Sequence, residues 1–226
     1  MDTAKKRWRV RRRRVLNLPR YTLGEEITNA ITHGAGALAA LVGFIVLLAQ
    51  GRNDFRTFVS ICIYGGTLVM LYTVSTLYHA LGINKGKKVF QILDHCTVYL
   101  LIAGTYTPIA LIAFGGTIGW VIVGIVWGVT ILGIVLNAVN MKKFRVISMV
   151  CYLTLGWLVI FFIRTLFESL DVNSIILLIA GGVCYTVGAV IFGLGRKIPY
   201  MHSLWHLFVL GGSIFHYFVI YSIAVG

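Results

Sequence analysis

Seven long apolar runs, separated by short polar connections, make up most of this chain. Each is long enough for the ~20 residues that a helix needs to cross the hydrocarbon core of a bilayer. The runs cover residues 27–50, 58–82, 90–114, 117–138, 146–167, 173–194 and 200–224. The short connections leave no room for a soluble domain. The pattern therefore predicts an all-α integral membrane protein, with a basic tail at residues 1–22 and a seven-transmembrane helix bundle at residues 23–226.

The composition supports this interpretation. Charged residues make up 12% of the 226 residues, and hydrophobic residues 58%, whereas a soluble domain has about 25% charged residues. The first run is too long for a signal peptide and lacks a small-residue cleavage site. Four cysteines fall inside the runs at no shared spacing, so we interpret Cys62, Cys96, Cys151 and Cys184 as small hydrophobic residues and not as a disulfide framework.

The basic residues predict the orientation in the membrane. If the runs alternate in direction, seventeen Lys and Arg residues lie on the side of the N-terminal tail, and only Arg52, Arg56 and Arg164 lie on the other. Basic residues are in excess on the cytoplasmic side of membrane proteins. We therefore expect the N-terminus in the cytoplasm, the C-terminus outside, and a multi-pass protein of the cell (plasma) membrane.

The tail is itself strongly basic, with nine Lys and Arg residues between Lys5 and Arg20. Such a segment can bind nucleic acid, but beside a transmembrane bundle contact with anionic lipid headgroups is the simpler interpretation. We expect membrane lipids as partners of this chain, and no nucleic acid.

Ionisable residues occur near the ends of three runs. Each costs roughly 2.5–3.5 kcal/mol on insertion scales, so each suggests a functional role. His79 ends the second run, Asp94 lies near the start of the third, and His202 and His206 begin the seventh. With alternating helix directions, all four fall at a similar depth, within about 10 Å along the axis, near the cytoplasmic face.

The spacing of these residues favours a metal site. His202 and His206 are four residues apart, so both imidazoles lie on one face of a helix. Together with His79 they would form a three-histidine site for zinc, whose catalytic sites keep three protein ligands and a water. Copper, iron and nickel also accept imidazole. Asp94 would hold or deprotonate the water, and Ser75, one turn before His79, would orient Asp94, bind the water or polarise a substrate carbonyl.

Two alternatives stay open at this point: the histidines could instead make interhelical hydrogen bonds, or the metal could be purely structural. His216 is ten residues beyond His206 and hence about 15 Å deeper. We expect it to make an interhelical hydrogen bond.

Glycine and proline predict local features of the bundle. Gly104 would let a neighbouring helix approach, and Pro108 would introduce a kink in its helix. Gly124 and Gly128 form a pair at a spacing suited to close helix contact.

Four ordered blocks of sequence resemble the hemolysin III family, the bacterial branch of the progesterone and adipoQ receptor group that includes the adiponectin receptors. The blocks are Glu26-Ile-Thr-Asn29-Ala-Ile-Thr32-His33, Ser75-Thr-Leu-Tyr78-His79, Leu93-Asp94-His95 and His202-Ser-Leu-Trp205-His206. The resemblance extends over about residues 22–224 and implies a seven-helix bundle with a cytoplasmic N-terminus.

The resemblance also implies zinc near the cytoplasmic side. Its ligands would be His79, His202 and His206, with Asp94 near the zinc-bound water and Ser75 behind the ligands. Glu26, Asn29 and His33 match the first block, whose role looks structural or pocket-lining, and His95 stands where adiponectin receptors have an aromatic residue. The large N-terminal domain of those receptors is absent, so hormone binding does not carry over.

Three functions follow as hypotheses. The group resembles alkaline ceramidases, which suggests a zinc-dependent hydrolase of a lipid amide or ester. The second is a receptor-like regulator of membrane lipid state or energetics with structural zinc. The third is a cytolysin, as the family name implies, although the seven runs include no amphipathic pore-forming segment.

Overall fold

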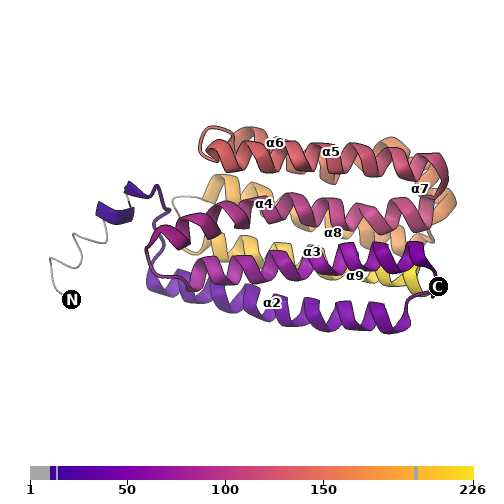
Figure 1. Cartoon of the computed structure of the whole chain (residues 1–226), viewed down its shortest axis with the longest axis horizontal. Helices are drawn as coiled ribbons and strands as arrows, with labels where there is room; N and C mark the ends of the chain where they lie inside the picture. The colour runs from indigo at the N-terminus through magenta and orange to yellow at the C-terminus, as the bar shows by residue number, and fades with distance from the viewer. Residues whose placement is uncertain (1–10, 14, 196–197) are drawn as a thin grey trace.

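The computed structural model describes residues 11–13, 15–195 and 198–226, and it places seven helical segments long and apolar enough to cross a membrane side by side in one bundle (Figure 1). Within the described residues there is no strand. The segments are α2 Leu23–Gln50, α3 Phe55–Ala80, α4 Lys85–Pro108 with η1 Ile109–Phe114, α5 Gly116–Asn140, α6 Arg145–Gly156 with η2 Leu158–Phe162 and α7 Ile163–Ser169, α8 Val172–Leu194, and α9 Met201–Val225. The prediction of a seven-helix membrane bundle is confirmed.

Polar side chains fix where four of the helices begin. Thr22 caps α2 in a reciprocal pair with Glu25, and Asp54, Asn84 and Asp171 accept hydrogen bonds from the first turns of α3, α4 and α8. These caps satisfy backbone N–H groups that a helix leaves unpaired at its start. They let α2, α3, α4 and α8 begin before the apolar runs that predicted them.

The fifth segment is not the continuous helix that the run at 146–167 predicts. It changes from α6 to the 3-10 helix η2 near Trp157 and returns to an α-helix at Ile163. The hydroxyl of Tyr106 on α4 donates to the carbonyl of Gly156 at 3.2 Å and accepts from the backbone N–H of Val159 at 3.0 Å. The break is tolerated inside the bundle because this side chain pairs the freed backbone groups.

The helix type of the third segment changes at Pro108, the residue where the sequence predicts a kink. The α-helix α4 ends at Pro108, and the chain continues as the π-helix η1 to Phe114. Proline lacks the N–H that an α-helix requires, so a change of helix type at this residue has a direct cause.

The glycine predictions have mixed outcomes. A Cβ on Gly104 would overlap the Thr67 side chain on α3, which confirms close approach at this position. The prediction for Gly124 and Gly128 was wrong, because a Cβ at either position would meet no atom of the described residues within 4 Å. The close contact on α5 is made at Gly133, which packs against the ring of Tyr99 on α4. The spacing of glycines alone does not say which face of a helix meets a neighbour.

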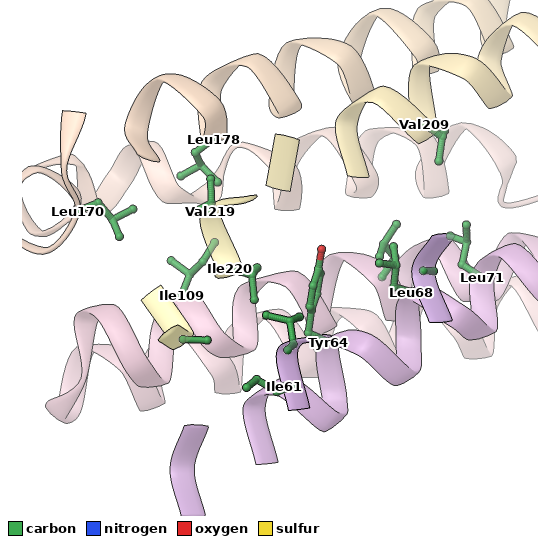
Figure 2. Close-up of a cluster of buried hydrophobic side chains, with 14 of the residues drawn as sticks. Ile61, Tyr64, Leu68, Leu71, Ile109, Leu170, Leu178, Val209, Val219 and Ile220 are labelled. Carbon is green, nitrogen blue, oxygen red and sulfur yellow. The ribbon is translucent and has the colours of Figure 1, made fainter. Parts of the chain in front are cut away.

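The buried core lies between α2, α3, α4, α8 and α9, where apolar side chains such as Tyr64, Leu68, Val209 and Ile220 pack together (Figure 2). A smaller cluster joins α4 and α5 to Leu155 on α6. Many large apolar side chains on the outer faces are exposed, as expected for a protein with lipid as its solvent. The four cysteines are free, and only Cys96 is fully buried.

The start of α2 and the end of α9 lie at opposite ends of the bundle (Figure 1). The start of α2 lies at the same end as the end of α3 and the starts of α4 and α9 (Figure 1), which we call the histidine end. Its cytoplasmic location stays a prediction of the charge pattern. Residues 1–10, which hold much of the basic tail, lie outside the described part of the chain.

Candidate metal centre

Three histidines from two helices converge at the histidine end. His79 lies at the end of α3, and His202 and His206 lie one turn apart at the start of α9. The Nε2 atom of His202 is 3.2 Å from Nε2 of His79 and 3.2 Å from Nε2 of His206. One nitrogen from each of the three rings lies within 4.8 Å of the others. The structure therefore confirms that these residues meet, although His79 and His202 are 123 positions apart in sequence.

Hydrogen bonds to the far nitrogens indicate how two of these rings are protonated. Nδ1 of His79 lies 2.9 Å from Oε2 of Glu26. A carboxylate only accepts, so this contact requires the proton on Nδ1 and leaves the lone pair on Nε2. The amide nitrogen of Asn29, 3.4 Å from the same Nδ1, is then a close neighbour of this nitrogen but not a donor to it.

A threonine hydroxyl indicates how His206 is protonated. The hydroxyl of Thr32 donates to the backbone carbonyls of Thr28 and Asn29, and its oxygen lies 3.2 Å from Nδ1 of His206. Because the hydroxyl proton is already donated to these carbonyls, the oxygen accepts a hydrogen bond from Nδ1–H of His206. The Nε2 lone pair of His206 then also faces the centre of the cluster.

The cluster fits a metal ion better than it fits hydrogen bonding. The Nε2 atom of His202 carries at most one proton, so it cannot donate to both neighbouring lone pairs. With Zn–N bonds of about 2.0–2.1 Å, two ligands of a tetrahedral zinc stand about 3.3–3.4 Å apart, close to the 3.2 Å separations found here. Metal-bound imidazoles typically donate their other N–H to a carboxylate or another oxygen, as His79 and His206 do.

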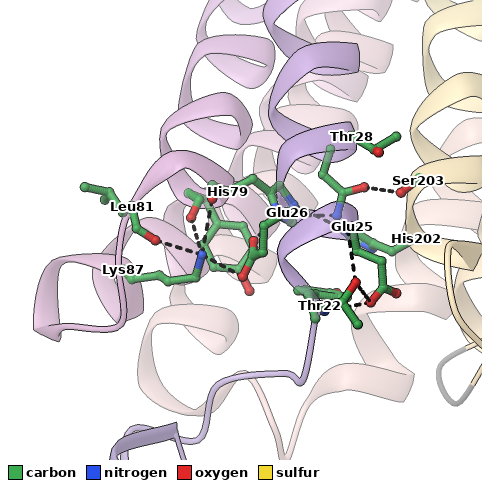
Figure 3. Close-up of polar contacts among 12 residues, drawn as sticks. Thr22, Glu25, Glu26, Thr28, His79, Leu81, Lys87, His202 and Ser203 are labelled. Carbon is green, nitrogen blue, oxygen red and sulfur yellow. Dashed lines mark hydrogen bonds and ion pairs between the residues drawn. The ribbon is translucent and has the colours of Figure 1, made fainter. Parts of the chain in front are cut away.

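Glu26 is in turn held by a lysine. Its Oε1 atom is 2.9 Å from Nζ of Lys87, which also donates to the carbonyls of Tyr78 at 2.9 Å and Leu81 at 3.0 Å (Figure 3). The sequence pattern left the role of Glu26 open and counted Lys87 only as a loop cation.

Further polar contacts fix α9 against α2. The Ser203 hydroxyl donates to Oδ1 of Asn29 at 2.6 Å (Ser203 is labelled in Figure 3). The backbone N–H of Tyr200 donates to Oε1 of Glu25 at 3.0 Å. Tyr200 has a left-handed backbone with φ 61° directly before the helix. These contacts set the rotation and depth of the first turn of α9, which carries His202.

Several aromatic rings pack against the cluster, and two of them stack on it. The ring of Tyr21 stacks on His202 with centroids 5.0 Å apart, and the ring of His33 stacks on His206 with centroids 3.5 Å apart. Burial, and after it the nearby Asp94 carboxylate, raise the pKa of Tyr21 above its ordinary value. Tyr21 thus contacts the histidine cluster and lies near the aspartate, which its position in the tail gave no reason to expect.

Asp94 and Ser75 are not part of the group of converging histidine nitrogens. Asp94 is 6% exposed and lines two cavities, both of which His202 and His95 also line. Ser75 lies one turn before His79 and is fully buried. Its Oγ has no hydrogen-bond partner among the described residues, nor have the ring nitrogens of His33, although buried polar groups are normally paired.

The first of these cavities runs into the bundle. It has a volume of about 140 Å³ and extends from Asp94 and His202 past Leu101 and Ala189 to His216, between α4, α6, α8 and α9. The second, of about 1370 Å³, is walled by residues 15–22 of the tail and by the ends of α5 and α8. Asp94 and His202 line both cavities.

His216 lies away from the cluster. Its Nε2 is 3.1 Å from the carbonyl of Leu178 on α8, which confirms the predicted interhelical hydrogen bond.

These features define a multi-pass membrane protein with a three-histidine cluster, able to hold a metal ion, at one end of a seven-helix bundle. The family described as Haemolysin-III related matches residues 21–217. The chain belongs to this family, which confirms the resemblance seen in its four sequence blocks.

Relatives from bacteria and mammals match over most of their length. Hemolysin-3 of Bacillus cereus is 43% identical over 198 residues, which cover 87% of this chain and 90% of the relative. The Hemolysin-3 homolog of Bacillus subtilis (strain 168) is 41% identical over 88% of this chain and 94% of its own length. Monocyte to macrophage differentiation factor of Homo sapiens is 27% identical over 89% of this chain and 85% of its own length.

Proposed function

We propose that this protein is a zinc-dependent hydrolase that cleaves an amide or ester bond of a membrane lipid. His79, His202 and His206 would hold the zinc. The observation that carries the proposal is the convergence of the three imidazoles, with Glu26 and Thr32 fixing two of them so that their Nε2 lone pairs meet beside a buried aspartate.

The cavities support a lipid as the substrate. The smaller cavity is lined mainly by apolar side chains and leads from the histidine end toward the middle of the bundle, so it suits a hydrocarbon chain. A substrate with its chain in this cavity would present its polar linkage to Asp94 and His202, which line both cavities.

Each residue then has a defined task. Bound zinc would supply a Lewis acid and lower the pKa of a water to about 7. Asp94 accepts the proton of the attacking water and returns it to the leaving group. Ser75 lines neither cavity, and its buried hydroxyl has no partner among the described residues, so we assign it to support of the zinc site behind the ligands and not to the substrate.

A hydrolysis screen tests this function. Purified protein in lipid nanodiscs is incubated with N-acyl and O-acyl lipids, and the released fatty acid is measured. We expect turnover by the wild type and a loss of about 10²–10⁴-fold in Asp94→Ala, the usual contribution of a general base. A wild type that holds zinc and releases no fatty acid from any of these lipids contradicts the hydrolase and favours structural zinc in a regulator.

The name Hemolysin-3 of the Bacillus cereus relative makes lysis a second candidate. Leakage of a dye from pure liposomes separates the two functions. A cytolysin releases the dye equally from the wild type and from a zinc-free His202→Ala variant, whereas the hydrolase causes no leakage without zinc.

A further inference from the structure

Lys87 is buried at the histidine end, with 3% of its surface exposed, although it lies in the first turn of α4 next to a connection. The neighbouring Lys85 is exposed, as expected for a helix start. Burying an ammonium group is costly unless the charge is paired and hydrogen-bonded. The contacts of Lys87 therefore identify what its burial stabilises.

Part of its role is local. Nζ donates to the carbonyls of Tyr78 and Leu81, which lie at the end of α3, where carbonyls lack partners within the helix and the helix dipole favours a cation. These bonds fix the turn that carries His79.

The rest of its role concerns Glu26. The two oxygens of this carboxylate are divided between two partners, with Oε1 on Nζ of Lys87 and Oε2 on Nδ1 of His79, each at 2.9 Å. The Glu26 side chain is 12% exposed, so without Lys87 the carboxylate is free to turn toward water. Anchoring one oxygen aims the other at the imidazole.

We propose that Lys87 is a positioning residue of the metal centre. Acting through Glu26, it holds His79 in the Nδ1–H tautomer and orients its Nε2 lone pair toward the zinc. The proposal rests on the proposed zinc site, and it adds a chain of contacts from Lys87 to Glu26 to His79 that joins α4, α2 and α3.

The test is a double-mutant cycle on zinc affinity, measured on the full-length protein in detergent by competition with a chromophoric chelator. The variants are Lys87→Met, Glu26→Gln and the double variant, with Lys85→Met as the matched control. Removing the hydrogen-bond partner of a ligand histidine typically weakens metal binding about 10–100-fold. We expect a loss of about this size in each single variant, and wild-type affinity in Lys85→Met.

The double variant distinguishes positioning of His79 through Glu26 from a role of Lys87 that only stabilises the end of α3. If Lys87 acts through Glu26, then Lys87→Met in the Glu26→Gln background weakens zinc binding by no more than about 2-fold. The visible absorption of bound cobalt(II) should change in the same way in both single variants and not in Lys85→Met. Should Lys87→Met aggregate, Lys87→Gln takes its place, because it keeps a hydrogen-bond donor and removes only the charge.

Two results overturn the proposal while leaving the metal site intact: zinc affinity in Lys87→Met within 2-fold of wild type, or losses that multiply in the double variant. A wild type that binds no zinc is a different failure, because it removes the proposed function on which this inference rests.

Discussion

Ser203 donates a hydrogen bond of 2.6 Å to the side-chain oxygen of Asn29, and both residues are buried. This contact joins α2 to α9 directly beside His202. We expect Ser203→Ala to destabilise the protein by about 1–3 kcal/mol, since it leaves the Asn29 oxygen buried without its partner. Unfolding in detergent by a denaturant titration measures the effect. Ser222→Ala, at an exposed position of the same helix, is the control. Equal stability of the two variants would show that the contact does not hold the helices together.

Gly104 and Gly124 form a matched pair for testing helix packing. Alanine at Gly104 must displace Thr67, so Gly104→Ala should cost about 1–3 kcal/mol by overpacking. Gly124 faces open space, so Gly124→Ala should leave stability unchanged or raise it by up to about 1 kcal/mol through helix propensity. Thermal unfolding of the two variants in one detergent makes the comparison. A larger loss at Gly124 would mean that α5 has a packing partner on that face.

The break in the fifth segment depends on one hydroxyl. Tyr106→Phe removes the partner of both the Gly156 carbonyl and the Val159 N–H, which lie in a segment apolar and long enough to cross a membrane. We expect a loss of about 1–3 kcal/mol and faster hydrogen exchange at Val159. Tyr200→Phe, at a half-exposed tyrosine, should change neither quantity. Unchanged exchange at Val159 in Tyr106→Phe would contradict this role of the hydroxyl.

The cap of α8 should give acid-dependent stability. The hydrogen bond from the Ser174 hydroxyl, and after it the one from the Ser174 backbone N–H, hold the pKa of Asp171 below its ordinary value of 3.8. A carboxyl with a lower pKa in the folded state stabilises the protein above its unfolded pKa, and this contribution is lost as the pH falls through the folded pKa.

The difference in melting temperature between wild type and Asp171→Ala should therefore stay constant from pH 7 to about 5 and shrink below about pH 4. Thermal scans across this range measure it. A difference that persists unchanged at pH 2 would mean that the carboxylate charge does not contribute to the cap.

The sequence predicted the parts of this site that follow from periodicity and alternating helix direction. Apolar runs locate the seven helices, and the spacing of His202 and His206 places both rings on one face, so their meeting with His79 was predictable. Depth and spacing also placed Asp94 and Ser75 near this site, and their roles stay proposals. The family blocks left the role of Glu26 open.

Other features depend on side-chain geometry that no spacing encodes. In the sequence, Lys87 is one of several cations near the second connection. The structure shows that it is buried and forms an ion pair with Glu26. Tyr21 precedes the first helix, so its stacking on His202 follows from the path of the tail. The break at Trp157 lies in an unbroken apolar run, and the hydroxyl that pairs its freed backbone groups belongs to a tyrosine 50 residues earlier in the chain than Gly156.

The central claim is that His79, His202 and His206 bind zinc, and metal content measured by mass spectrometry tests it most directly. After gentle, chelator-free purification we expect about one zinc per wild-type chain, and none in His79→Ala, His202→Ala or His206→Ala. Zinc should remain in Asp94→Ala and in His216→Ala, whose imidazole bonds to Leu178 away from the cluster. A wild type free of zinc, or histidine variants that retain it, would contradict the account, and the three rings would then be interpreted as packing contacts.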